Sequence, residues 1–279
     1  MTYSKLNIAF STCPNDTFMF DALVNRRLKS LNFSVEVQLA DIEELNRLTM
    51  AGEPDISKVS YAAYPAISDK YQLLSAGSAL GYKNGPLIIS KRKIYSDELV
   101  DVKMAIPGKM TTANFLLSIL FPEVKNKSEY LFSDIEEAVL SNEIDAGLVI
   151  HETRFIYKNK GLKLVSDLGE LWEEKFNLPI PLGGIVVKRD FPEEVKLDIQ
   201  KTISESIQFA FNNRKASLQY IKEYAQELDN KVINQHIDLY VNDFSVDLGE
   251  EGRKAVELLF SKGEKAGLFE LKNKSIFVG

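Results

Sequence analysis

His151 is the side chain of this protein best suited to proton transfer. It is one of two histidines among 279 residues, and it directly follows the apolar run Gly147–Ile150. An apolar run of this length predicts a buried strand, so the imidazole is expected where the strand meets a loop or a cleft. Imidazole accepts and releases protons near neutral pH, which makes His151 a candidate general base. A structural histidine at a strand end is the alternative.

A loop that opens a predicted helix suits the binding of an anion. It contains Thr111, Thr112 and Ala113. The free backbone amides and the positive end of the helix dipole favour a carboxylate there, and the threonine hydroxyls can add hydrogen bonds. Capping of the helix by Thr111 or Thr112 is the alternative role.

A second group of candidate binding residues follows a short predicted strand. Ser57, Lys58 and Ser60 lie where ligands of open parallel sheets bind, beyond the carboxyl end of the strand. Lys58 could pair with a negative charge in such a cleft. An ordinary solvated lysine is the alternative, because lysines are mostly exposed.

The polar loop near the N-terminus contains Asn15, Asp16 and Thr17, any of which could simply cap a helix predicted to begin at Phe18. Cys13 precedes them, but no base lies beside it in the sequence, so it is interpreted as a small packing residue rather than a nucleophile. The second histidine, His236, lies in a segment of helical periodicity. It is expected to be structural or surface-exposed.

Two segments of the chain follow the same plan of strand, polar loop, helix, strand, helix and strand. In the first, strands are predicted at 6–10, 33–39 and near Ser57, with helices from 18 to 28 and from Asp41 to Gly52. In the second, strands are predicted at 104–106, 130–132 and up to His151, with helices from 113 to 121 and from Ser133 onward. Two βαβαβ units explain this repetition economically, although chance similarity of two α/β stretches is the alternative.

Two further predicted strands, at 85–92 and 183–189, are interpreted as crossings between two lobes. The tail from Phe191 onward is helical by periodicity and should pack back on the first lobe. The predicted fold class is therefore α/β, with two βαβαβ lobes joined by two crossover strands around a central cleft, as in type II periplasmic-type solute-binding proteins. The predicted domain bounds are 1–90 with 186–279 for the first lobe and 91–185 for the second.

The composition excludes several classes of function. With 45% hydrophobic and 27% charged residues, a net charge of −6 and no apolar stretch of about 18 residues, the chain is expected to be soluble, cytoplasmic and without a membrane partner. One cysteine excludes an internal disulfide, and the histidines offer no metal-ligand spacing. Lysine and arginine are scattered, so a nucleic-acid partner is not expected either. Small molecules are the expected partners.

Ser11–Phe18 resembles the Ser-Pro-Cys-Pro-Asn-Asp-Thr-Phe opening of the 1,4-dihydroxy-6-naphthoate synthases of the futalosine route to menaquinone. Further stretches resemble the same family in the same order: Lys58–Tyr61, Ile106–Gly108, Thr111–Ala113, Asp145–Glu152 and Leu182–Ile185. Together they span most of the chain, and the ordered set is specific. Thr12 stands where the family has proline, which removes no reactive group. The C-terminal region matches less distinctly, so no role is carried onto it.

The resemblance implies a lyase of the carbon–carbon type that acts on cyclic dehypoxanthinyl futalosine. It would release 1,4-dihydroxy-6-naphthoate and a sugar-derived fragment without a metal or an organic cofactor. The base of the family corresponds to His151, and the aspartate of its Asp-Thr-Phe motif corresponds to Asp16, the second expected catalytic residue, which could orient the substrate or assist proton transfer. The substrate's carboxylate and hydroxyls would be held by the remaining candidate residues: Asn15, Thr17, Ser57, Lys58, Ser60, Thr111, Thr112 and Ala113.

Two alternative functions remain open at this point. One is a non-catalytic solute-binding module for a small carboxylate, because transport receptors share the scaffold. The other is a chorismate dehydratase, a sister enzyme of the same pathway on the same fold. The Pro-Asn-Asp-Thr-Phe stretch and the Ile-His-Glu ending favour the naphthoate-forming enzyme.

Overall fold

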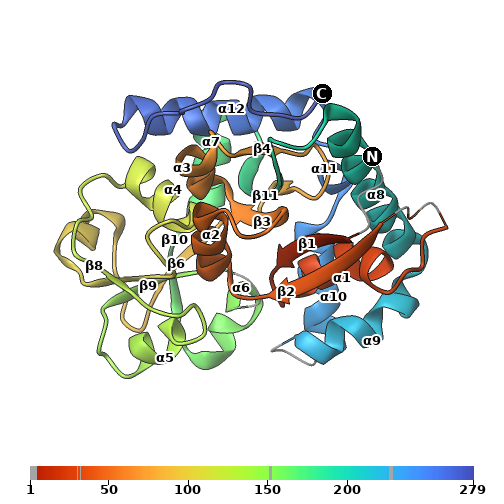
Figure 1. Ribbon diagram of the computed structural model, residues 1–279. Coiled ribbons are helices and arrows are strands. Elements are labelled where there is room, and N and C mark those ends of the chain that lie inside the picture. The colour runs from red at the N-terminus through yellow and green to blue at the C-terminus, as the bar shows by residue number, and fades with distance from the viewer. Residues whose placement is uncertain (1–4, 30, 32, 151–152, 226–228) are drawn as a thin grey trace. The chain divides into compact units, whose positions relative to one another are not determined.

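The computed structural model describes residues 5–29, 31, 33–150, 153–225 and 229–279 (Figure 1). The chain divides into two compact units, one made of Met1–Gly81 with Pro181–Gly279 and the other of Tyr82–Ile180. These bounds differ from the predicted domain bounds, because residues 82–90 belong to the second unit and residues 181–185 to the first. No helix in the described part of the chain is long and apolar enough to cross a lipid bilayer.

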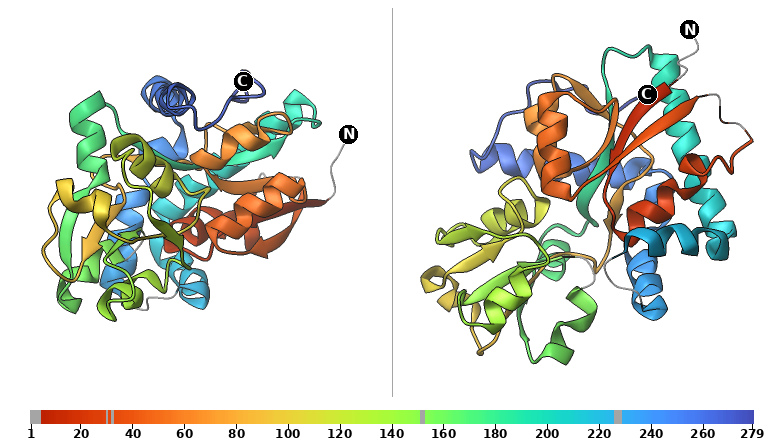
Figure 2. Two further views of the ribbon diagram at one scale, coloured as in Figure 1. Left: turned by 90° about the vertical axis from the view of Figure 1, so that its left-hand side faces the viewer. Right: turned by 60° about the horizontal axis from the view of Figure 1, so that its bottom comes forward.

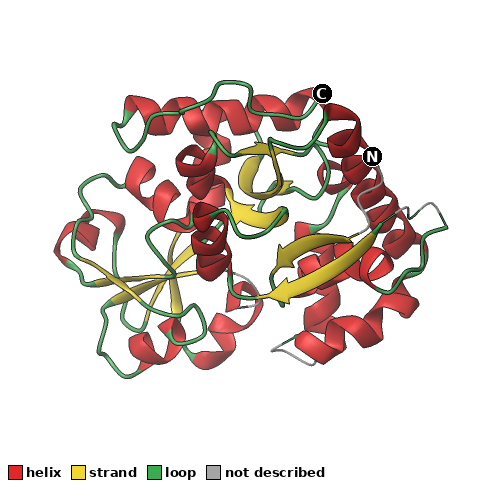
Figure 3. Cartoon of the chain, viewed as in Figure 1, coloured by secondary structure: helices red, strands yellow, loops and turns green. Residues whose placement is uncertain are grey.

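The first unit is built on a mixed sheet (Figure 3). Its strands are β1 (Lys5–Phe10), β2 (Ser34–Leu39), β3 (Ile56–Ser60), β4 (Tyr71–Leu73), β5 (Ala79–Gly81) and β11 (Ile180–Lys188). The order is β2-β1-β3-β11-β4, and β5 pairs with β11. β1 is parallel to β2 and β3, whereas β11 is antiparallel to β3 and β4. The carboxyl ends of β1 and β3 therefore lie at the same edge of this sheet.

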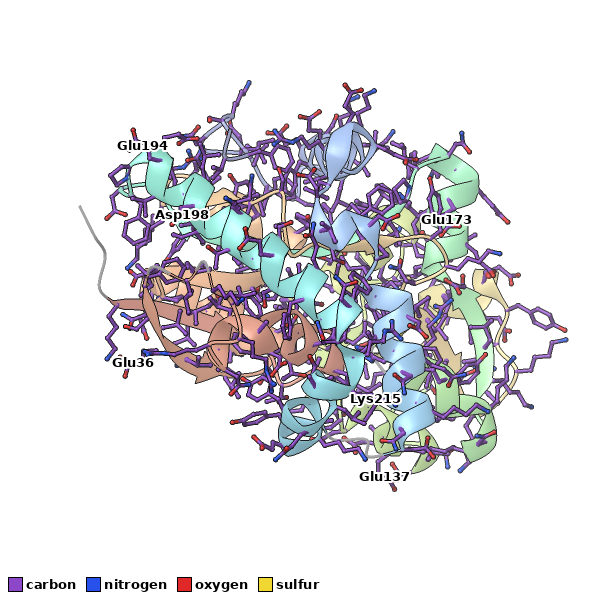
Figure 4. All side chains as sticks on the ribbon, turned by 90° about the vertical axis from the view of Figure 1, so that its right-hand side faces the viewer. Glu36, Glu137, Glu173, Glu194, Asp198 and Lys215 are labelled. Carbon is purple, nitrogen blue, oxygen red and sulfur yellow. The ribbon has the colours of Figure 1, made fainter. Side chains whose placement is uncertain are left out.

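Eight α-helices and one short 3₁₀ helix among the described residues complete the first unit. They are α1 (Pro14–Val24), α2 (Ile42–Ala51), η1 (Tyr61–Ala63), α3 (Tyr64–Ile67), α8 (Glu193–Asn212), α9 (Arg214–Tyr224), α10 (Asn230–Tyr240), α11 (Asp243–Val246) and α12 (Gly249–Lys265). α1 packs against α8, α9 and α10 (Figure 2). The predicted helical periodicity of the tail is confirmed by α8, because Ile199, Ile203 and Ile207 are buried, whereas Glu194 and Asp198 are exposed (Figure 4).

The second unit has its own mixed sheet. The strands are β6 (Leu87–Ser90), β7 (Met104–Ile106), β8 (Lys127–Glu129), β9 (Ala146–Val149) and β10 (Lys163–Asp167), in the order β10-β6-β9-β7-β8. β7 is parallel to β8 and β9, whereas β6 is antiparallel to β9 and β10. The helices are η2 (Ser96–Asp101), α4 (Thr112–Leu120), α5 (Ile135–Leu140), α6 (Thr153–Ile156), η3 (Tyr157–Lys160) and α7 (Leu168–Phe176).

The predicted duplication is confirmed by the topology of the two sheets. Each contains three neighbouring parallel strands, β2-β1-β3 in one unit and β8-β7-β9 in the other. In each, the third parallel strand has an antiparallel neighbour, β11 or β6. The same pattern of strand, helix and strand thus builds both units.

Three local predictions are wrong. α1 begins at Pro14 rather than Phe18, because the proline presets the helical φ angle and the preceding Cys13 is extended. The second strand of the second unit is Lys127–Glu129 rather than 130–132, and Leu131 is 61% exposed, so this apolar residue is not in a buried strand. The helix predicted from Ser133 onward is α5, whose N-cap is Asp134 rather than Ser133 and has no side-chain cap, whereas Asp41 caps α2 as predicted.

Candidate functional site

Asp16 lies buried in the first turn of α1, where four donors surround its carboxylate. Oδ2 accepts from the hydroxyl of Ser11 at 2.6 Å and from the Ser11 backbone N–H at 3.3 Å. Oδ1 accepts from Nδ2 of Asn15 at 2.8 Å, and Nζ of Lys58 lies 3.3 Å from the same oxygen. A carboxylate removed from water needs this kind of compensation by charge and hydrogen bonds. The structure therefore brings Asn15, Asp16 and Lys58 together.

Lys58 is a buried cation rather than a solvated surface lysine. It lies in β3, its residue is 3% exposed, and its ammonium also donates to the carbonyl oxygen of Gly77 at 2.8 Å. The alternative that Lys58 is solvated is wrong. Every residue of β3 is buried, and the ammonium contacts Asp16 and Gly77 instead of water. A buried ion pair with additional hydrogen bonds holds both side chains in one geometry.

Asn15 joins this group to a residue far along the chain. Its Oδ1 lies 2.9 Å from Nε2 of His236 on α10, and His236 is fully buried. We call Ser11, Asn15, Asp16, Lys58 and His236 the Asp16 cluster. His236 is structural in the sense predicted, but its hydrogen bond to a candidate site residue was not foreseen. The sequence did carry a signal for it, because His236 lies between the apolar positions Ile233 and Ile237 of its helix, and a buried polar side chain needs a hydrogen-bond partner.

The residues around Asp16 do not merely cap a helix, as the local alternative supposed. The N-cap position of α1 is Cys13, and no side chain caps it. Thr17 lies inside the helix, and its hydroxyl donates to the carbonyl of Cys13 at 3.1 Å, one turn back. Thr17 thus tightens the first turn of α1 and is buried.

Ser57, Lys58 and Ser60 lie within β3 and not, as predicted, beyond its carboxyl end, because the strand continues to Ser60. Ser57 and Ser60 are both buried. The hydroxyl of Ser57 donates to the Lys58 carbonyl at 3.0 Å. Ser60 is held by Asn46 of α2, whose Oδ1 accepts from the Ser60 backbone N–H at 3.0 Å and whose Nδ2 donates to its hydroxyl at 3.3 Å. Asn46 was missed in the sequence. It lies on the face of α2 that buries Leu45 and Thr49, so its polar type at a core position was the signal.

Two glycines of β11 let that strand approach β3 and the residues after it. Gly183 pairs with Ser60, and a Cβ on Gly183 would lie 2.8 Å from the Val59 carbonyl oxygen and 3.6 Å from Cε of Lys58. A Cβ on Gly184 would lie 3.0 Å from the Tyr61 ring. Burial raises the pKa of the Tyr61 phenol, which is hydrogen-bonded to Ser78 at 2.8 Å and so stays neutral.

Gly183→Ala is expected to destabilise the first unit by about 1–3 kcal/mol, because the added methyl group meets a backbone carbonyl that cannot turn aside. Urea unfolding followed by circular dichroism would measure this loss. If the variant were as stable as the wild type, β3 and β11 would be able to move apart at this point with no loss in the free energy of unfolding, which would contradict the prediction.

In the second unit, Thr111 is the N-cap of α4. Its hydroxyl accepts from the Asn114 backbone N–H at 3.3 Å and donates to the Gly108 carbonyl at 2.8 Å. The capping role considered for this residue is therefore present. Thr112 and Ala113 follow in the first turn and are both buried. The first turn of α4 therefore has backbone N–H groups at the N-terminal end of the helix, a geometry that suits an anion.

Thr111→Ala is expected to lower the stability of the second unit by about 1 kcal/mol, the usual effect of losing an N-cap hydroxyl. Trp172 is the only tryptophan of the chain and is buried in this unit, so its fluorescence during urea unfolding reports the change. Thr111→Ser keeps the capping oxygen and is the matched control. An equal loss in both variants would contradict the capping contribution.

The candidate base His151 lies outside the described residues. The strand predicted to end there is β9, which ends at Val149. β9 packs closely on α5, since a Cβ on Gly147 would lie 2.5 Å from Cγ2 of Ile135. After residue 152, Arg154 of α6 donates to the Gly85 carbonyl and to Asp167, each at 2.6 Å.

The chain is similar to known proteins over nearly its full length. Residues 6–265 match the family model described as menaquinone biosynthesis. A relative from Thermus thermophilus, named 1,4-dihydroxy-6-naphthoate synthase, is 41% identical over 98% of this chain and 99% of its own length. The crystal structure of a protein from Archaeoglobus fulgidus is 35% identical, with a TM-score of 0.90 over 95% of this chain and 98% of that one.

A more distant solved structure shows the fold alone. The alkanesulfonate-binding protein from Xanthomonas axonopodis is 13% identical and has a TM-score of 0.71 over the whole of this chain and 97% of its own. The fold is therefore that of the periplasmic-type binding proteins, as predicted. The family model and the relative from Thermus thermophilus both match nearly the full length, so the chain belongs to the menaquinone biosynthesis family.

Proposed function

We propose that this protein is a 1,4-dihydroxy-6-naphthoate synthase, a lyase that converts cyclic dehypoxanthinyl futalosine to 1,4-dihydroxy-6-naphthoate. The observation that carries the proposal is the 41% identity to an enzyme of that name over nearly the full length of both chains. The proposal includes a small substrate with a carboxylate and a cytoplasmic location.

His151 is assigned the role of general base. A neutral imidazole can take a proton from the sugar-derived ring of the substrate, which starts an elimination that leaves the carbocycle aromatic. Aromatisation favours the forward direction, so the protein needs to supply a positioned base and a fixed substrate rather than a strong oxidant.

In the first unit, Asp16 is assigned a positioning role that its contacts support. Both oxygens of this carboxylate already accept hydrogen bonds from Ser11 and Asn15, and Lys58 lies beside them. Such a network keeps side chains at a binding surface within a narrow range of geometry. The other candidate residues of this unit are assigned to the hydroxyl or carboxylate groups of the substrate, which they hold directly or by shaping this edge of the sheet. They are Asn15, Thr17, Ser57, Lys58 and Ser60.

In the second unit, the start of α4 is assigned to the substrate's carboxylate. Thr112 and the Ala113 amide lie in the first turn of that helix, where the helix dipole and the backbone N–H groups attract a negative charge. Thr111 supports this role by holding the turn through its bond to Gly108.

Incubation of the purified protein with cyclic dehypoxanthinyl futalosine, followed by mass spectrometry, tests the proposal. We expect 1,4-dihydroxy-6-naphthoate to form in proportion to the protein added, and none with heat-denatured protein. Binding of the substrate without product would instead support a solute-binding module. Chorismate is the second substrate to test, and its dehydration would identify the sister activity.

A further inference from the structure

We infer that His236 is a positioning residue of the Asp16 cluster, which it orients by donating a hydrogen bond from Nε2 to the side-chain carbonyl of Asn15. The kinetic part of this inference rests on the proposed function, whereas the hydrogen bond does not. Nothing in the resemblance assigns a role to this region of the chain.

The contacts form a continuous chain through the buried interior of the first unit. Nε2 of His236 lies 2.9 Å from Oδ1 of Asn15, and Nδ2 of Asn15 lies 2.8 Å from Oδ1 of Asp16. Lys58 then lies 3.3 Å from that carboxylate oxygen. His236 and Asp16 are 0% and 2% exposed, so water does not substitute for these partners.

The donor and the acceptor of each hydrogen bond can be assigned in order, starting from the carboxylate of Asp16. An ionised carboxylate beside an ammonium group only accepts, so the atom of Asn15 that faces Asp16 must be the amide nitrogen. The carbonyl oxygen of Asn15 then faces His236 and also only accepts. Nε2 of His236 must therefore carry a hydrogen. The charge on Asp16 thus determines, through Asn15, that Nε2 of His236 is protonated, although Asp16 and His236 are not in contact.

The same reasoning gives the function of His236. The amide of Asn15 can turn by half a rotation with little change of shape, and that rotation would place its oxygen against the carboxylate of Asp16. The N–H of His236 opposes this rotation, because a turned amide would present its own N–H to that donor. The imidazole is also held by the Tyr240 ring, at 4.7 Å between centroids. His236 thereby keeps Asp16 and Lys58 in one arrangement.

The protonation of Nε2 can be tested without any substrate. The chain has two histidines, so the His151→Gln variant contains one imidazole, and its ¹⁵N signals belong to His236. Long-range ¹H–¹⁵N correlation spectra separate protonated from bare ring nitrogens. We expect Nε2 to be protonated at neutral pH in the folded protein. A bare Nε2 with a protonated Nδ1 would overturn the inference, whatever the protein catalyses.

Steady-state kinetics on the otherwise unaltered protein tests the positioning role. His236→Leu removes the donor, whereas His236→Gln offers a side-chain N–H in a similar place. We expect kcat to fall about tenfold in His236→Leu, with KM changed less than about threefold, and to be largely restored in His236→Gln. Ile233→Val, a buried change on the same helix, is the control for stability alone.

A structural role alone would give a different pattern. His236→Leu would then lose thermal stability as Ile233→Val does, and it would keep the wild-type kcat below its unfolding temperature. That result would overturn the positioning role while leaving the proposed reaction intact. Failure of the wild-type protein to form naphthoate would instead refute the proposed function, and the spectra would still decide the hydrogen bond.

Discussion

His151→Ala is expected to lower the turnover of cyclic dehypoxanthinyl futalosine by at least about a hundredfold, the lower end of what a general base contributes. KM should change little, because the imidazole is assigned to proton removal in the transition state and not to holding the substrate. Single-turnover formation of naphthoate, measured by mass spectrometry, gives the rate of the chemical step directly.

The control for this variant is Asn159→Ala, an exposed position of the same unit that should keep the wild-type rate. Near-normal turnover in His151→Ala would remove the general-base role from this residue. A rise in KM with an unchanged kcat would instead assign it to substrate binding.

Asp16→Asn is expected to destabilise the first unit by about 3–5 kcal/mol, because it leaves the ammonium of Lys58 buried without its counter-charge. The side chains of the pair are 2% and 4% exposed, so solvent screening gives little relief. The double variant Asp16→Asn/Lys58→Met should lose less than the sum of the two single variants, since it removes the stranded charge. Urea unfolding followed by circular dichroism measures all three.

An exposed ion pair of the same unit is the control for this experiment. Lys5 and Glu36 lie 2.6 Å apart with side chains 59% and 62% exposed, and Glu36 projects from the edge of β2 (Figure 4). Glu36→Gln should change the stability by no more than about 1 kcal/mol. Additive effects of Asp16→Asn and Lys58→Met would contradict an energetic coupling between the two side chains.

Much of the fold was predictable because it depends on local patterns. The alternation of apolar residues located β1 and β2, and the spacing from Asp41 to Glu44 predicted the start of α2. The errors fell where local signals compete. In the apolar run around Leu131, Tyr130 packs against the core of the second unit but Leu131 is exposed, and the strand formed earlier, at Lys127–Glu129.

The candidate site was predictable only in part. The Asp16 loop, the segment around Lys58 and the start of α4 were identified from residue type and position. The pairing of Asp16 with Lys58 was not, because lysines are usually solvated and the two lie on different elements. Asn46 and His236 were not assigned to the site, since each enters it only through a contact with a residue distant in sequence.

The repeated α/β plan, the family and the residue types that can move a proton or attract an anion were all evident in the amino-acid sequence, because periodicity and short motifs are properties of neighbouring residues. Which polar groups share a buried environment depended on the packing of distant segments. His236 and Asn15 are 221 positions apart, yet their hydrogen bond sets the orientation of the amide beside Asp16. The reason is physical: a charge removed from water must find its partners in space, and packing, not sequence distance, determines which groups those are.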